Sequence, residues 1–322
     1  MKKMKVEEVG MKSHLSKALI LMLSAFLTIP VVTFAGQAAA GGGDSQNNEI
    51  AITCGDQPGN KSISGVLAHL DPTEPHTIRV SGTCKENVVI QSFDRLTLIA
   101  NPGAAISDAS AGNTAVVDIE DSQRITLQGF TINGGATGVV CGDHSLCHFK
   151  GNTVQGVTNG GDGVDVVRFS QATLEGDVIQ FNSGDGLDVA DGASEASVTG
   201  AKIQYNANDG IFVGLNSTLR ANGNQIVGNG GNGVSVFNSS VARFGTVRNP
   251  ANGNIITNNA GPGVVMRDVS FAVFAPSRNM VTSNNIRTGG VGVDVDCAPQ
   301  FSATRGANSN NLGGGTTNCV EP

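Results

Sequence analysis

A unit of about 23 residues recurs along most of this 322-residue chain. Each copy has a glycine followed by an aliphatic residue, and the successive glycines stand 25, 23, 24, 23, 30 and 29 residues apart. They are Gly138, Gly163, Gly186, Gly210, Gly233, Gly263 and Gly292. Self-similarity with a period of about 20–50 residues is the signature of solenoids and propellers. The repeat therefore constrains the fold more than any other feature of the sequence.

The residue pattern inside one unit predicts short strands. Val164 and Val166 flank Asp165, so a strand here would bury both valines and turn the aspartate outward. Further strands are expected around 172–174 and 178–181. Three strands and three turns in so short a unit make one coil of a solenoid, in which equivalent residues of successive coils stack ~4.8 Å apart.

The leucine-rich repeat is the competing solenoid, because its period lies in the same range. It needs an L-x-x-L-x-L frame and a helical return, whereas these units carry Gly and Asn in that region. The units resemble the right-handed parallel β-helix repeats of the pectate-lyase-like superfamily, over residues 77–296. The resemblance implies an all-β fold, a right-handed parallel β-helix of about ten coils.

An asparagine stands four residues before five of the repeat glycines. The five are Asn159, Asn182, Asn206, Asn229 and Asn259. In the superfamily that the units resemble, an internal asparagine ladder at a tight turn is structural. We therefore expect all five to be turn residues whose side-chain amides bond between coils, and not ligands.

The ends of a solenoid must be capped, because exposed strands would pair with other molecules. Apolar residues at helical spacing follow Ser62, at Ile63, Val66, Leu67 and Leu70, and predict a short amphipathic helix. We expect an N-terminal cap over 41–76, the β-helix over 77–296 and a C-terminal cap over 297–322.

Residues 1–40 have the pattern of an export signal. Five lysines within the first 17 residues precede an apolar run, 18–35, and small residues follow it. A membrane anchor is the alternative, but the run contains Pro30 and leads into a glycine-rich stretch. We expect the mature chain to carry no transmembrane segment and to be periplasmic, on the cell surface or extracellular.

The six cysteines fit an exported protein. They fall into three sequential clusters, which predict three local disulfides, although six cysteines allow 15 connectivities. The clusters are Cys54 and Cys84, Cys141 and Cys147, and Cys297 and Cys319. A zinc site would need two CxxC pairs or similar spacing, which the sequence lacks.

Composition narrows the choice of partner. Beyond the lysine-rich start, 15 basic residues face 25 acidic ones, so the chain is a poor candidate for nucleic-acid binding. The chain has no Trp and a single Tyr, which weakens the expectation of sugar binding by ring stacking. Nothing in the sequence sets an oligomeric state.

Stacked coils should bring Asp165 and Asp188 to the same height, with Arg168 as the nearest cation. Asp162, Asp185 and Asp209 should form a second ladder in the preceding turn. Two carboxylates ~5 Å apart repel, so either one pKa rises or a cation such as calcium binds between them. A carboxyl with a raised pKa can act as a general acid, while the alternative is that these are ordinary polar turn residues.

No enzyme family's signature is present. The Asp-Asp, His-Gly and Arg-Ile-Lys elements of polygalacturonases are missing, as are the Trp-containing signatures of pectate lyases and pectin methylesterases. Asp71-Pro72 continues with Thr73 and not with the histidine of alginate epimerases. His144 and His148 lie at the Cys141/Cys147 loop, where exposed polar residues are expected in any case.

We therefore expect an exported β-helix protein that contacts polysaccharide along its lateral face. If it is an enzyme, it is a lyase or a hydrolase that uses Asp165, Asp188 and Arg168, and calcium is the candidate ion at Asp165 and Asp188. The alternative is a non-catalytic structural or adhesive surface protein.

Overall fold

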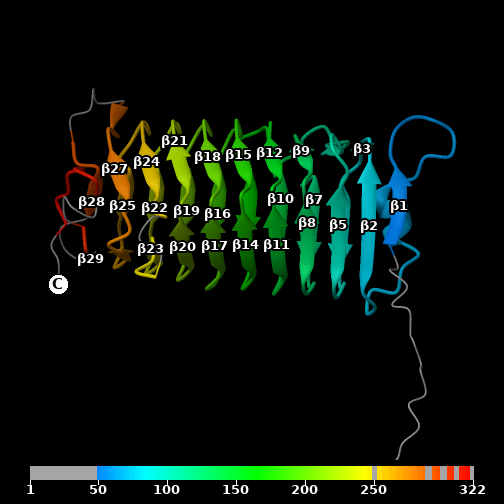
Figure 1. Ribbon diagram of the computed structural model, residues 1–322, viewed down its shortest axis with the longest axis horizontal. Coiled ribbons are helices and arrows are strands. Elements are labelled where there is room, and N and C mark those ends of the chain that lie inside the picture. Colours follow the sequence, from blue (N-terminus) through cyan, green and yellow to red (C-terminus); the bar gives the residue numbers. More distant parts are fainter. Residues whose placement is uncertain (1–48, 249–251, 287–291, 298–302, 308–311, 320–322) are drawn as a thin grey trace, which may run out of the picture. The chain divides into compact units, whose positions relative to one another are not determined.

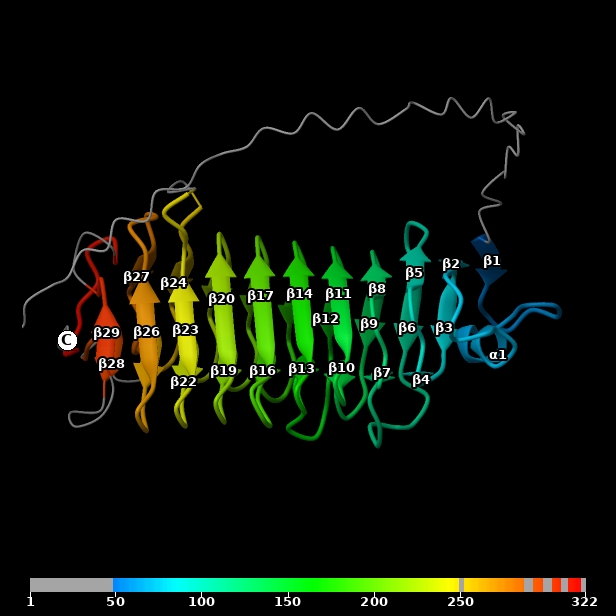
Figure 2. The same cartoon turned by 90° about the horizontal axis from the view of Figure 1, so that it is seen from below.

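The computed structural model describes residues 49–248, 252–286, 292–297, 303–307 and 312–319. In this part of the chain, successive coils each add strands to three parallel sheets, which run side by side along the solenoid (Figure 1, Figure 2). The expected export signal, 1–40, lies outside the described residues. No helix within the described ranges has both the length and the apolar character that a membrane span requires.

Three sheets contain all the named strands. Sheet A has eleven: β1 (Glu49–Thr53), β2 (His76–Ser81), β5 (Leu96–Ala100), β8 (Ile125–Gln128), β11 (Leu146–Lys150), β14 (Gln171–Glu175), β17 (Glu195–Thr199), β20 (Thr218–Asn222), β23 (Val241–Phe244), β26 (Phe271–Phe274) and β29 (Ala303–Arg305). Sheet B has nine: β3 (Thr83–Lys85), β6 (Ala105–Ser107), β9 (Thr131–Asn133), β12 (Thr153–Gln155), β15 (Val178–Gln180), β18 (Lys202–Gln204), β21 (Gln225–Val227), β24 (Ile255–Thr257) and β27 (Met280–Thr282). Sheet C also has nine: β4 (Val88–Gln91), β7 (Val117–Glu120), β10 (Val139–Gly142), β13 (Val164–Val166), β16 (Leu187–Val189), β19 (Ile211–Val213), β22 (Val234–Val236), β25 (Val264–Met266) and β28 (Val295–Cys297).

The strand register follows the sequence repeat. Val164 of β13 pairs with Leu187 of β16, and Val166 pairs with Val189, all in parallel. These side chains are buried because the first and third residues of the short sheet C strands point into the solenoid, while the middle residue points out. The predicted all-β parallel β-helix of about ten coils is confirmed.

An asparagine ladder occupies the turn between sheets B and C. Asn182 donates its backbone and side-chain N–H groups to Oδ1 of Asn206, at 3.2 and 3.0 Å. Asn206 donates in the same way to Asn229, and the ladder continues through Asn259 to Asn284, which the repeat pattern missed. Each member is buried, so the ladder satisfies polar groups that water cannot reach.

The prediction that Asn159 belongs to this ladder was wrong. The backbone N–H that meets Oδ1 of Asn182 is that of Val157. The turn before Gly163 is two residues longer than those before Gly186 or Gly210, so the ladder position falls on Val157. Asn159 lies beyond it with φ of 62°, and its side chain donates to the carbonyl of Gly112 at 3.3 Å.

Two further buried rows were not anticipated from the sequence. In the turn between sheets C and A, serine hydroxyls accept backbone N–H groups of the preceding coil; the row is Ser122, Ser145, Ser170, Ser194, Ser217, Ser240 and Ser270. The row between sheets A and B contains Asn152, Asp177, Asn224, Asn254 and Asn279. Burial raises the pKa of Asp177 to about 6. The turns between sheets A and B, B and C, and C and A therefore each contain side-chain hydrogen bonds that join neighbouring coils.

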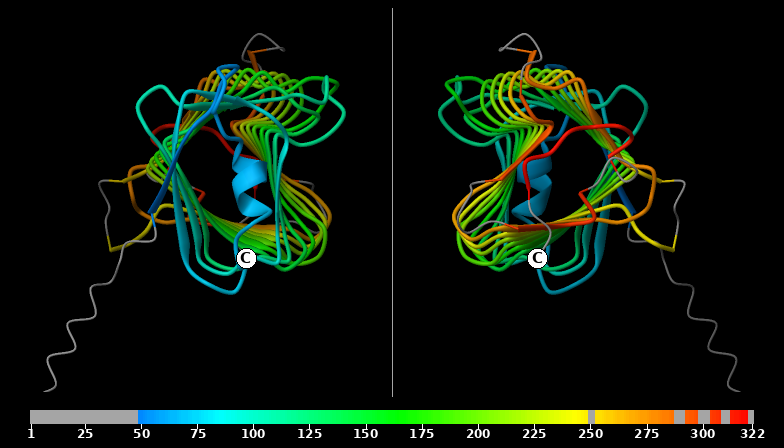
Figure 3. Two further views of the ribbon diagram at one scale, coloured as in Figure 1. Left: turned by 90° about the vertical axis from the view of Figure 1, so that its right-hand side faces the viewer. Right: turned by 90° about the vertical axis from the view of Figure 1, so that its left-hand side faces the viewer.

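The N-terminal end has a cap. The expected helix is α1 (Ile63–Leu67), which begins after Ser62 and buries Ile63 and Leu67. Glu86 accepts the N–H groups of Ile63 and Ser64, at 2.8 and 2.9 Å. Figure 3 shows α1 lying across the end of the coils. Within the segment expected to be only a cap, β1 also pairs with β2 and extends sheet A.

The three predicted disulfides are present. They join Cys54 to Cys84, Cys141 to Cys147, and Cys297 to Cys319. The first lies at the N-terminal end and the last at the C-terminal end, where β29 and a bridge between Val295 and Thr317 continue the strand pairing. Covalent links therefore reinforce both ends of the solenoid.

Candidate functional site

The outward row of sheet C carries the candidate site. The middle residue of each strand points away from the core, and the register places Asp165 of β13 directly beside Asp188 of β16. The row in order is Val89, Asp118, Val140, Asp165, Asp188, Phe212, Ser235, Val265 and Asp296. Asp165 and Asp188 are the only two acids in this row that lie on adjacent coils.

A second row of acids lies in the turn that leads into sheet C. Oδ1 of Asp162 accepts the backbone N–H of Asp185 at 2.5 Å, and Oδ1 of Asp185 accepts that of Asp209 at 2.7 Å. Oδ1 of Asp209 accepts the N–H of Asn232 at 2.6 Å. These carboxylates hold the turns together, and each needs one oxygen for that purpose.

Three carboxylates from the two rows form one cluster. One oxygen from each of Asp162, Asp165 and Asp188 lies within 4.8 Å of the others. Oδ1 of Asp165 and Oδ1 of Asp188 are buried and accept no hydrogen bond within the described residues. The nearest donor to Asp165 is the Thr137 hydroxyl, 3.4 Å from Oδ2. Asp165 and Asp188 thus lie close to other carboxylates and accept few hydrogen bonds.

The electrostatic consequence is that these carboxyls hold protons near neutral pH. Burial, followed by the charges of Asp162 and Asp185, raises the pKa of Asp165 to about 7. Burial, followed by the charges of Asp165 and Asp162, raises the pKa of Asp188 to about 8. Since the two groups interact, we read these values as those of a pair that keeps a proton near neutral pH.

Arg168 does not contact this pair. Its Nε donates to Asp143 Oδ1 at 2.6 Å, and its Nη2 lies 3.4 Å from Glu120 Oε1. A Cβ at Gly142 would lie 2.4 Å from Nη2, so the guanidinium packs over a position that only glycine leaves free. Arg168 therefore neutralises acids one and two coils from the pair, near Asp118, whose pKa burial also raises.

A divalent cation fits the three-carboxylate cluster. Calcium takes oxygen ligands at about 2.3–2.6 Å, so two ligand oxygens on one ion lie at most about 5 Å apart. The oxygens of Asp162, Asp165 and Asp188 meet this limit. The sequence predicted Asp165 and Asp188 as ligands; Asp162 could have been added, because it precedes Asp165 by three residues in the turn of the same coil.

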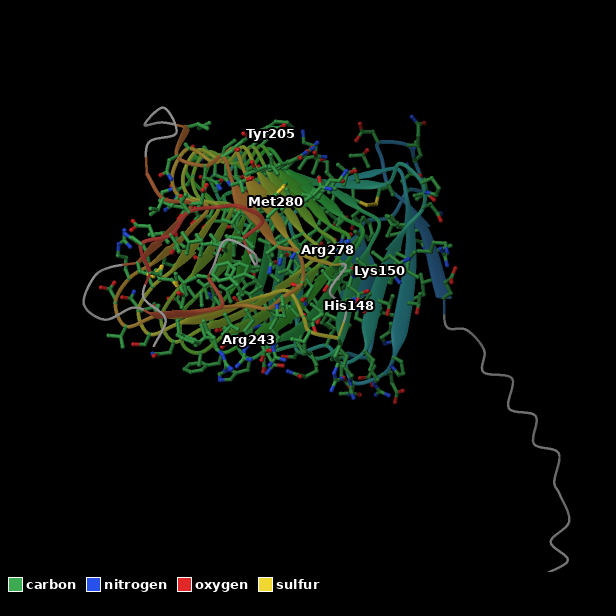
Figure 4. The ribbon with its side chains drawn as sticks, turned by 60° about the vertical axis from the view of Figure 1, so that its left-hand side comes forward. His148, Lys150, Tyr205, Arg243, Arg278 and Met280 are labelled. Carbon is green, nitrogen blue, oxygen red and sulfur yellow. A yellow bond between two sulfur atoms is a disulfide. The ribbon has the colours of Figure 1, made fainter. Side chains whose placement is uncertain are left out.

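The histidines at the Cys141–Cys147 loop lie elsewhere. His148 is on sheet A, where its Nε2 lies 3.3 Å from Glu175 Oε2, and His144 stacks on Phe169 with ring centroids 5.5 Å apart. Figure 4 shows His148 and Arg243 on sheet A, away from Tyr205 at another edge of the solenoid. Neither histidine joins the carboxylate cluster.

Two solved structures with TM-scores above 0.5 support the fold. Pectate lyase Pel9A aligns with 81% of this chain and 78% of its own, at 12% identity and a TM-score of 0.52. The ORF18 protein of Geobacillus virus E2 aligns with 79% of this chain and 59% of its own, at 11% identity and a TM-score of 0.51. The mannuronan C-5 epimerase AlgE4 A-module of Azotobacter vinelandii covers 80% of this chain and 83% of its own, at 13% identity and a TM-score of 0.44.

No significant match to a curated protein sequence was found. The family model described as "Right handed beta helix region" matches residues 137–304, which is 168 of the 322 residues. The match spans more than half of the chain and includes the coils that carry Asp162, Asp165 and Asp188. The chain therefore belongs to the right-handed β-helix family.

Proposed function

We propose that this protein binds a polysaccharide along sheet C and that Asp165 and Asp188 act on it as an acid–base pair. The observation that carries the proposal is the direct pairing of the two carboxyls on adjacent coils, each with a buried oxygen that accepts no hydrogen bond among the described residues. A pair that shares a proton near pH 7 offers one group that can donate and one that can accept.

Polysaccharide is proposed as the ligand by analogy of fold. Pectate lyase Pel9A shares the solenoid but only 12% of its sequence, so the analogy supports a class of ligand and no particular sugar. A solenoid also suits a long ligand, because its coils repeat the same surface along one direction. The three disulfides support the further proposal that the protein is exported to the periplasm, the cell surface or the medium.

Two chemistries fit the cluster. In a hydrolase, the protonated carboxyl would give its proton to the glycosidic oxygen, while the ionised one would attack the sugar carbon or activate water. In a lyase, Asp162, Asp165 and Asp188 would hold calcium, which supplies the positive charge that a uronate carboxylate needs. We favour hydrolysis, because Asp165 and Asp188 lie side by side on adjacent coils and their raised pKa values leave the pair with a proton near neutral pH, so one carboxyl can donate while the other accepts. Arg168 contacts neither carboxyl of the pair, so its proposed role is limited to adding positive charge near sheet C.

The test is a product assay on uronate and neutral polysaccharides, with calcium and with chelator. A hydrolase releases reducing ends in both conditions, whereas a lyase releases unsaturated uronates that absorb in the ultraviolet and that chelator abolishes. Asp165→Asn and Asp188→Asn should each lower the rate at least about 100-fold.

Asp268→Asn is the matched control. Asp268 is an exposed acid just after β25, three coils from the strand that carries Asp188, and its replacement should leave the rate unchanged. Activity that survives the Asp165→Asn, Asp188→Asn double variant would overturn the site assignment. Binding with no product from any polysaccharide would favour the non-catalytic structural or adhesive role.

A further inference from the structure

A column of residues with positive φ marks the corner where sheet B ends. Hydrogen bonds between backbones link consecutive members of the column to the neighbouring coil. The members are Gly134, Gly156, Phe181, Tyr205, Gly228, Asn258 and Ser283, with φ between 56° and 85°. Three of the seven are glycine and two are small polar residues, which is what a left-handed backbone favours. Phe181 and Tyr205 are therefore the exceptions.

The rings of Phe181 and Tyr205 contribute little to the stability of the fold. Bulky side chains are uncommon at positive φ and persist there only where the surrounding structure enforces that backbone. Here the exposed fraction is 57% for Phe181 and 50% for Tyr205, so both rings remain half in water. Glycine serves at three equivalent positions of the same column. Since packing within the chain does not require the two rings, we infer that they contact a ligand.

The two rings form one apolar platform. Their centroids lie 5.5 Å apart with an angle of 12° between the ring planes, so the rings are stacked along the solenoid. On one side, the Tyr205 ring lies against Gly228, where a Cβ would be 2.6 Å from its Cε1. On the other side, the next coil carries Gly156, where a Cβ would meet one atom within 4 Å, at 3.8 Å. The platform is therefore bordered by glycines and stays accessible.

A row of side-chain amides runs beside the platform. Gln204 donates to Gln180 at 2.9 Å, Gln180 donates to Gln155 at 3.0 Å, and Gln155 donates to Asn133 at 3.0 Å. Gln180 and Gln204 immediately precede the two aromatic residues. Gln155 and Gln180 each use one N–H and one lone pair in the row, and Gln204, at its end, uses one N–H. Each glutamine therefore keeps a second N–H and at least one lone pair for a ligand.

We propose that this corner, Phe181 and Tyr205 with Gln155, Gln180 and Gln204, is a subsite that binds a pyranose ring of the polysaccharide. A pyranose has an apolar face of C–H groups that packs on aromatic rings and a rim of hydroxyls that both donate and accept hydrogen bonds. The corner offers both kinds of partner side by side. The inference rests on the proposed function for the class of ligand, and it concerns binding and not catalysis.

The chain provides its own probe for this subsite. Tyr205 is the only tyrosine and there is no tryptophan, so the intrinsic fluorescence excited above the phenylalanine band comes from this ring alone. Galacturonate, mannuronate and glucose oligosaccharides are titrated in turn into the full-length protein. At least one should change the emission saturably, and Phe181→Gly should weaken that binding about tenfold.

Phe181→Gly should also fold well, because glycine removes the positive-φ strain at this position. Phe169→Gly is the matched control: Phe169 has φ of 63°, is 60% exposed and stacks on His144, and its loss should leave the dissociation constant unchanged. The inference is overturned if no oligosaccharide changes the Tyr205 emission, or if both variants weaken binding equally.

The two proposals fail separately. Turnover of a polysaccharide with no response from Tyr205 and no effect of Phe181→Gly would overturn the subsite alone. A saturable Tyr205 response in a protein that makes no product would overturn the acid–base role of Asp165 and Asp188 and leave the subsite standing.

Discussion

At the residue scale, Asp188 makes stability depend on pH. Its folded-state pKa of about 8 lies above the ordinary value of 3.8, so the folded protein keeps a proton that the unfolded chain releases. The free energy of unfolding should therefore fall as pH rises from about 4 to about 8. Asp188→Asn cannot ionise, and we expect it to stabilise the protein by about 1–2 kcal/mol at pH 8.5 and little at pH 4.5.

The measurement is a series of denaturant titrations across this pH range, with chelator present so that no cation offsets the repulsion. Asp268→Asn, which replaces an exposed acid, should follow the wild-type curve. Equal effects of Asp188→Asn at both pH values would show that the carboxyl is ionised throughout and would contradict the raised pKa. Added calcium at pH 8.5 should stabilise the wild type more than Asp188→Asn if the cluster binds the ion.

At the scale of one element, the asparagine ladder holds the turn between sheets B and C. Oδ1 of Asn206 accepts two N–H groups of Asn182, and its Nδ2 donates to Ile179 and Asn229. Asn206→Ala would leave buried donors and acceptors without partners, at a cost of about 2–4 kcal/mol. Denaturant unfolding followed by circular dichroism would measure the loss.

Asn159→Gly is the comparison for this turn. Asn159 lies outside the ladder with positive φ, which glycine adopts freely, so we expect a change below about 1 kcal/mol. If Asn159→Gly destabilised the protein as much as Asn206→Ala, the hydrogen-bonding pattern of this turn would be wrong.

At the scale of the whole molecule, the ends are the weak points. Coils contact only their neighbours, so an end coil has one partner where a central coil has two. Cys297–Cys319 ties the C-terminal segment to the end of sheet C. The Cys297→Ser, Cys319→Ser double variant should speed amide exchange in β25 to β28 by about tenfold or more and leave β13 to β19 unchanged.

Hydrogen exchange read by mass spectrometry would locate the change. The Cys141→Ser, Cys147→Ser variant is the control, since that disulfide closes a six-residue separation in a central coil with neighbours on both sides. Faster exchange spread evenly over all coils of the Cys297 variant would show that the solenoid unfolds as one unit and would contradict this picture.

The sequence alone determined the coil and its register. Once Gly163 and Gly186 are equivalent, Val164 must stack on Leu187 and Asp165 on Asp188, because parallel strands with the same period meet residue by residue. The Asn ladder followed from the same regularity, except where a turn changed length, while the three disulfides followed from the sequential clustering of the six cysteines. Two extra residues before Gly163 moved the ladder position from Asn159 to Val157, and a repeat alone does not say where in a turn an insertion is accommodated.

Only the tertiary structure determined which residues the long side chains in the turns contact. Arg168 stands three residues after Asp165 in sequence, yet the turn at φ of 54° directs it to Asp143 and Glu120 on other coils. Nothing in the sequence indicated that the single Tyr would stack on Phe181 from the coil before, as it does in the folded chain. A strand's period fixes which face a residue occupies, whereas the direction of a side chain in a turn depends on backbone angles and on neighbouring coils, which no short stretch of sequence encodes.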